Sequence, residues 1–104
     1  MVLNYDDIAG RLAQVHKEMT LQGDSVKASY PSEGLSFEEE MEQIREFIEE
    51  AGEYGIAYEC LVANLESAPF VITAKSTLAL LEVALLFGFK TDRDEDAKFD
   101  RRAS

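Results

Sequence analysis

Hydrophobic side chains near the start of the chain recur every three or four positions, which is the spacing of one face of an α-helix. They are Tyr5, Ile8, Leu12, Val15 and Met19. Asn4 precedes them as a suitable N-cap, and two aspartates follow it where negative charge favours a helix start. This pattern predicts an amphipathic helix from about residue 5 to 22. The stretch 24–35 has no period and several turn-forming residues, so we expect a loop there.

A second amphipathic helix begins at a capping box formed by Ser36 and Glu39, in which each side chain is expected to bind the other residue's backbone N–H. Gly52 is the expected end of this helix. The buried stripe is predicted to comprise Phe37, Met41, Ile44, Ile48 and Ala51.

Two further helices are predicted in the second half of the chain. Apolar residues recur at helical spacing from Ile56 to Leu65, and the tight junction at 53–55 indicates an antiparallel hairpin with the preceding helix. We expect residues 70–72 to form a short extended connector, and Thr73 to cap a helix that runs from 74 to about 87 and stops at Gly88. Because this last helix is apolar on nearly every side, we expect it to be the central one.

These elements predict an all-α fold, a compact bundle of about four helices. Residues 1–89 would form a single domain with one modest core, and residues 90–104 a charged tail that we expect to be disordered. The single cysteine, Cys60, excludes an intramolecular disulfide and is expected to be a small core residue.

No part of the sequence predicts contact with a membrane. The most apolar stretch, 77–89, is too short to cross a bilayer and contains Glu82. The N-terminus carries acidic residues where a signal peptide would carry basic ones. We therefore expect a cytoplasmic protein.

The charge of the chain is strongly acidic and unevenly placed. Its 21 acidic and 10 basic residues give a net charge of −11, and residues 36–66 hold ten acids against one base, Arg45. Such a field disfavours direct binding of nucleic acid and of anionic membranes. It favours a basic protein as partner, because complementary potentials accelerate encounter.

Glutamates of the second predicted helix stand four residues apart at 38/42, 42/46, 46/50 and 49/53. Like-charge pairs at this spacing destabilise a helix by about 0.2–0.5 kcal/mol each. One interpretation is a solvated face that keeps the protein in solution; the other, which we favour, is a surface that meets a basic partner. The candidate partner-binding residues are Glu39, Glu42, Glu46, Glu49, Glu50 and Glu53, with Tyr54 and Tyr58 as aromatic anchors.

Catalytic chemistry is not predicted. His16 is the only histidine, so one chain cannot assemble a Ser–His pair, a Cys–His pair or a histidine-based metal cluster. We expect His16 to be an ordinary surface or flanking residue. We also expect no enzyme activity, no cofactor and no metal; an enzyme that uses carboxylates alone is the weakest alternative.

The segment 52–66 reads Gly-Glu-Tyr-Gly-Ile-Ala-Tyr-Glu-Cys-Leu-Val-Ala-Asn-Leu-Glu. Followed by a short loop with a proline and a further helix, it resembles the MafI-type immunity proteins, small helical antitoxins related to those of contact-dependent growth inhibition. The resemblance extends over about residues 36–89. It implies a bacterial protein that neutralises a toxin's C-terminal domain, often an RNase such as an EndoU-like nuclease. The glycines at 52 and 55 also suit a sharp turn between closely packed helices, so the motif marks either the fold or a contact site.

Two functions therefore remain open at the level of sequence. The first is an immunity protein whose acidic surface binds a basic toxin domain. The second is a non-enzymatic adaptor or structural module that forms a homodimer through the apolar fourth helix, if the other helices leave part of it exposed.

Overall fold

The computed structural model describes residues 4–87, and all secondary structure in this part of the chain is helical. The prediction of an all-α bundle is thereby confirmed; the predicted tail, 90–104, and the predicted stop at Gly88 lie outside the described residues. The elements in chain order are α1 (Tyr5–Thr20), α2 (Gly23–Val26), the 3-10 turn η1 (Lys27–Ser29), α3 (Phe37–Glu49), α4 (Tyr54–Ser67) and α5 (Ala74–Phe87). None of these helices has the length and hydropathy that a membrane span requires.

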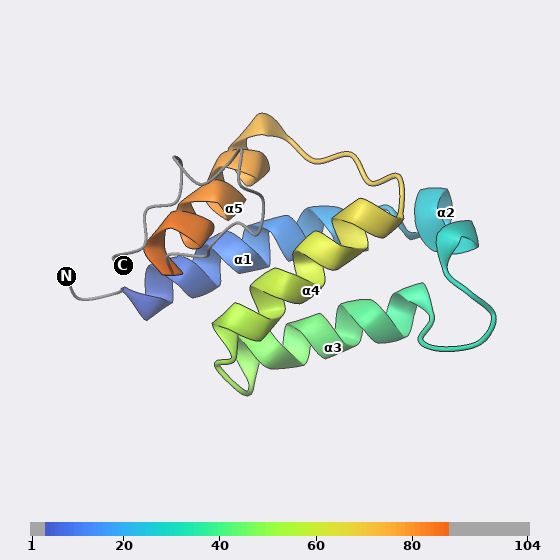
Figure 1. The fold of residues 1–104 in the computed structure, drawn as a ribbon, viewed down its shortest axis with the longest axis horizontal. Coiled ribbons are helices and arrows are strands. Elements are labelled where there is room, and N and C mark those ends of the chain that lie inside the picture. The colour runs from blue at the N-terminus through green and yellow to red at the C-terminus, as the bar shows by residue number, and fades with distance from the viewer. Residues whose placement is uncertain (1–3, 88–104) are drawn as a thin grey trace, which may run out of the picture.

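Helix α1 lies at the centre of the bundle and contacts α3, α4 and α5 (Figure 1). The predicted apolar stripe of this helix is confirmed for Ile8, Leu12, Val15 and Met19, which are completely buried, but not for Tyr5, which is 53% exposed at the first position of the helix. Asn4 caps the helix as predicted, accepting a hydrogen bond from the Asp7 amide at 3.0 Å. The four buried residues extend from the first to the last turn of α1, and they share one core cluster with apolar residues of α3, α4 and α5.

The expectation that α5 is the central helix is wrong. Its buried residues are Ser76, Ala79 and Val83, whereas Leu78, Leu81 and Leu85 are 60%, 55% and 49% exposed. A helix that is apolar all round carries no direction in its hydropathy, so the sequence does not indicate which face packs. The face that meets the rest of the bundle includes two small side chains, and three of the five leucines of α5 lie on the outside, while Leu80 and Leu86 pack against the core.

Polar contacts with α1 fix the N-terminal end of α5. The Glu18 carboxylate accepts hydrogen bonds from the Thr73 amide at 2.8 Å, from the Thr73 hydroxyl at 2.9 Å and from the Ser76 hydroxyl. The hydrogen bond from Ser76, and then that from the Thr73 amide, hold the pKa of Glu18 below its ordinary value of 4.5. Thr73 caps α5 as predicted, since its hydroxyl oxygen accepts from the Ser76 amide at 3.1 Å.

Further contacts set the direction of α5 and the course of the connector that precedes it. The Gln22 side chain binds the backbone N–H and C=O of Val71, at 2.8 and 2.6 Å. Farther along α5, Arg11 forms an ion pair with Glu82 at 2.9 Å. Since early residues of α5 meet the end of α1 and later ones meet its beginning, the two helices are antiparallel.

The predicted loop at 24–35 is partly helical. Residues Gly23–Val26 form α2, and Val26 is completely buried. A Cβ atom at Gly23 would lie 2.8 Å from the ring of Phe37, so the absence of a side chain allows α2 to approach α3 closely. A single helical turn is too short to show a period, which explains why the sequence does not reveal it.

The hairpin of α3 and α4 forms as predicted. The capping box is present, with the Glu39 amide donating to Ser36 Oγ at 3.1 Å and the Ser36 amide to Glu39 Oε1 at 3.2 Å. Gly52 adopts φ +63°, the left-handed conformation that lets the chain reverse after α3.

Two details of the predicted hairpin are wrong. Ala51 is exposed rather than part of the buried stripe, because α3 ends at Glu49 and the helical period ends with it. Gly55 is not required for close packing, since a Cβ atom there would meet nothing within 4 Å.

The central position of α1 can be tested by truncating one leucine from each of two helices. Leu12→Ala in α1 is expected to lower the free energy of unfolding by about 2–5 kcal/mol, because it leaves a cavity in the core. The control Leu81→Ala in α5 should change it by less than about 0.5 kcal/mol. Urea denaturation followed by circular dichroism measures both; a larger loss from Leu81→Ala would contradict the arrangement.

Candidate functional site

The glutamates of α3 all lie outside its buried stripe, and the stripe is held against α1 and α4. We call the exposed ones the acidic face; they are Glu38, Glu39, Glu42, Glu46, Glu49 and Glu50. Glu53, also predicted as a contact residue, is exposed in the turn before α4. The structure therefore presents all six predicted glutamates to solvent, and five of them on one helix and its C-cap.

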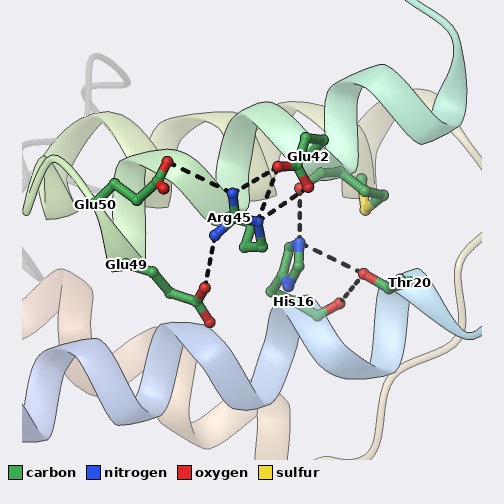
Figure 2. A network of polar contacts seen from close by, with 7 residues as sticks. His16, Thr20, Glu42, Arg45, Glu49 and Glu50 are labelled. Atoms are coloured by element: carbon green, nitrogen blue, oxygen red, sulfur yellow. Dashed lines mark hydrogen bonds and ion pairs between the residues drawn. The ribbon is translucent and has the colours of Figure 1, made fainter.

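Arg45 organises the second half of the acidic face (Figure 2). Its guanidinium lies 2.6 Å from Glu42, 2.8 Å from Glu49 and 3.5 Å from Glu50. The hydrogen bond from Arg45 is the main reason that the pKa of Glu42 lies below its ordinary value of 4.5. The same contacts raise the pKa of Arg45. Three of the predicted partner-binding glutamates are thus already ion-paired within the chain, although exposed pairs add little stability.

Four glutamates of the acidic face, including the ion-paired Glu42, line a shallow, open hollow of about 400 Å³, which we call the acidic hollow. No hydrogen bond or ion pair is formed by the side chains of Glu38 and Glu46 within residues 4–87. The hollow is lined by Leu35, Glu38, Glu39, Glu42, Gln43 and Glu46. It combines uncompensated negative charge with one apolar side chain, since Leu35 is 40% exposed.

The two tyrosines predicted as aromatic anchors are half-buried and pack against the core. The ring of Tyr54 stacks on that of Tyr5, with centroids 6.0 Å apart. Burial, and to a lesser extent the charge of Glu66, raises the pKa of Tyr58. Neither tyrosine lines the acidic hollow, so the structure does not bring the predicted aromatic anchors and the hollow together.

His16 has a structural contact that the sequence did not indicate (Figure 2). Its Nε2 lies 2.8 Å from the backbone oxygen of Met41, and because a carbonyl oxygen only accepts, the imidazole donates. The bond joins α1 to α3 beside the acidic face. The charge of His16 also contributes, as the smallest of the causes, to the low pKa of Glu42.

A polar pocket, which sequence reasoning missed, lies between α3, α4 and the loop that follows η1; we call it the Asn64 pocket. Asn64 is only 6% exposed and accepts a hydrogen bond from the Tyr30 hydroxyl at 2.5 Å. Its amide nitrogen donates to Glu40 at 3.1 Å and to the Cys60 carbonyl at 2.8 Å. The pocket has a volume of about 230 Å³. The available signal was an asparagine at a stripe position of α4, where an apolar residue is expected.

Nucleophilic and metal-binding chemistry finds little support in the described part of the chain. The pKa of the Cys60 thiol is raised by burial and then by the charges of Glu40 and Glu59, so the thiolate is disfavoured. Within residues 4–87 no three histidine, cysteine, aspartate or glutamate side chains are grouped so that they could hold a metal ion.

No family model, no curated protein and no solved structure matches the chain. The resemblance of residues 52–66 to MafI-type immunity proteins therefore stays a prediction based on those residues.

The Arg45 network can be tested by removing its cation. In Arg45→Gln the pKa of Glu42 is expected to rise towards 4.5, because its main charged hydrogen-bond donor is lost. Carboxyl ¹³C NMR titration measures this pKa. Glu18 serves as the internal control, since its pKa is lowered by Ser76 and Thr73 and should not move. An unchanged Glu42 pKa would show that the contact with Arg45 does not persist in solution.

Proposed function

We propose that the chain is an immunity protein that binds and neutralises a bacterial toxin domain, a basic RNase, through its acidic face. The observation that carries the proposal is the acidic hollow, which is lined by an exposed leucine and by four glutamates, of which Glu38 and Glu46 form no ion pair within residues 4–87. The resemblance of residues 52–66 to MafI-type immunity proteins supports it. In this proposal the protein acts in the cytoplasm, where the toxin would meet RNA, and acts by binding rather than by catalysis.

The chemistry of the hollow suits a basic protein surface. A nuclease must attract the phosphates of its RNA with clustered lysines and arginines. Glu38 and Glu46 offer those side chains charges that are not already neutralised, and Leu35 offers apolar contact for their methylene stems. An inhibitor held there would cover surface that RNA needs and would be steered to it by long-range attraction.

Arg45 gives the acidic face two parts with different expected roles. Glu49 and Glu50 are ion-paired at the hairpin end, so a partner gains little further attraction there. Glu38 and Glu46 form no ion pair within residues 4–87, so we expect the electrostatic attraction of a basic partner to be strongest around the hollow.

The proposal is tested with a tagged chain used to capture its partner from the native lysate, followed by an assay of the captured protein for RNase activity and its inhibition. The double variant E38K/E46K should weaken binding about tenfold or more, because it sets lysines against a basic surface. The control D24K/E59K changes the net charge equally at exposed positions outside the hollow, and should retain affinity.

We expect binding by the wild type to weaken with increasing salt. Of the two double variants, only E38K/E46K should lose inhibition. Equal affinity of the two double variants would refute the acidic hollow as the contact surface. A captured partner without RNase activity would refute the proposed toxin class.

A second candidate function rests on the exposed leucines of α5. Leu78, Leu81 and Leu85 follow one another at helical spacing and are each about half exposed or more. The only charged residues of α5 are Lys75 and Glu82, so two strongly acidic chains would meet there with little repulsion. This arrangement favours an adaptor that forms a homodimer through α5.

Light scattering distinguishes this alternative. A homodimer predicts twice the mass of one chain at micromolar concentration, and a return to monomer in Leu81→Glu, which places a charge in the contact. The exposed Leu21→Glu is the matched control outside α5. A wild-type chain that is monomeric under these conditions would exclude the homodimer.

A further inference from the structure

We propose that the Asn64 pocket binds a guanidinium group, presented as an arginine side chain by the protein partner. The pocket is a concave site beside the acidic hollow and is lined by both polar and apolar side chains. Its polar side chains are those of Ser29, Tyr30, Glu40, Asn64 and Ser67.

The hydrogen-bond donors and acceptors of the pocket indicate what kind of ligand it can bind. The only hydroxyl hydrogen of Tyr30 is donated to Asn64 Oδ1, and that of Ser67 to the Ala63 carbonyl at 2.7 Å. Both amide hydrogens of Asn64 are donated as well, to Glu40 and to the Cys60 carbonyl. Apart from the exposed hydroxyl of Ser29, which can donate or accept, the unused capacity is therefore that of acceptors, on the Tyr30 and Ser67 oxygens and the Glu40 carboxylate. The complementary ligand is a hydrogen-bond donor.

The negative charge of Glu40 favours a cation as the ligand of the pocket. Glu40 is half-buried and forms no ion pair within residues 4–87. Its described polar contact is the neutral amide of Asn64, which leaves the carboxylate without a positive partner. A cation that reaches Glu40 would form a charge-assisted hydrogen bond in a partly desolvated site, which is stronger than an exposed one.

The apolar lining of the pocket and the number of its acceptors favour arginine among the cationic side chains. Pro31, Leu35 and Ala68 contribute apolar wall that can cover a methylene stem. The planar guanidinium carries five donors in a fixed fork, so it can donate to a carboxylate and to further acceptors at the same time. A lysine ammonium is a compact point charge with three donors, and it matches several separate acceptors less well.

The position of the pocket connects it to the acidic face. Leu35 lines both the Asn64 pocket and the acidic hollow, so the two are neighbouring parts of one surface. A basic protein that contacts the hollow can insert an arginine into the pocket in the same encounter. This last step rests on the proposed function; the preference of the pocket for guanidinium does not.

The pocket is tested first without any partner, by NMR titration of the full chain with N-acetylarginine amide. Saturable shifts are expected for the Asn64 side-chain amide and for backbone amides lining the pocket. The corresponding citrulline derivative, in which a neutral urea replaces the guanidinium, should not bind, and the lysine derivative should bind more weakly. In Glu40→Gln the arginine derivative should bind about tenfold more weakly, because a charged hydrogen bond is lost.

Glu59→Gln, which removes an exposed carboxylate on the same helix as Asn64, is the matched control and should bind like the wild type. Glutamine at position 40 keeps an oxygen to accept from Asn64, so the fold is expected to persist, which circular dichroism checks. Equal binding of the citrulline derivative, tighter binding of the lysine derivative, or unchanged binding in Glu40→Gln would each overturn the proposal.

A second measurement separates this proposal from the proposed function. With the captured RNase, Glu40→Gln should weaken binding about tenfold, whereas Glu59→Gln should not. If the Asn64 pocket is wrong but the function is right, E38K/E46K lowers affinity and Glu40→Gln leaves it unchanged. If the function is wrong but the pocket is right, the arginine derivative still binds while no RNase is inhibited.

Discussion

The burial of one apolar stripe on α1 is the constraint on which the rest of the structure depends. The four large side chains of this stripe are completely buried, and α3, α4 and α5 all pack around the helix that carries them. Removing such side chains from water supplies most of the free energy that holds a domain of this size together. Polar contacts then act at the edges of this core, where Glu18, Gln22 and Arg11 fix the position and direction of α5.

The acidic face follows from that packing. Because α3 turns its stripe towards the core, all of its glutamates except the half-buried Glu40 are exposed to solvent, where their charges are tolerated. His16 locks this orientation with a hydrogen bond to the Met41 carbonyl. Arg45 then neutralises part of the face (Figure 2). The charges of Glu38 and Glu46 are left without an ion pair within residues 4–87. An arrangement that serves the core thus concentrates negative potential at one place on the surface, which is the kind of feature a basic partner recognises.

Asn64 has the opposite effect, because it brings a polar group into the packed interior. A buried amide without partners is costly, and here all of its hydrogen-bonding groups are occupied by Tyr30, Glu40 and the Cys60 carbonyl. These bonds join α4 to α3 and to the chain just after η1. The requirement to satisfy one side chain therefore positions Tyr30 and Glu40 together at the edge of a pocket, next to the acidic hollow.

The sequence by itself determined the elements whose signal is local and periodic. The stripes of α1 and α3, the capping box at Ser36, the turn at Gly52 and the exposure of the glutamates all follow from spacing and cap chemistry, which act within a few residues. Only the tertiary structure decided that α5 lies at the edge, because its uniform hydropathy gives no preferred face. It alone also joined Tyr30 and Glu40 to Asn64 across 34 and 24 residues of chain. Contacts between residues so far apart in sequence depend on how helices pack, and no local pattern encodes that packing.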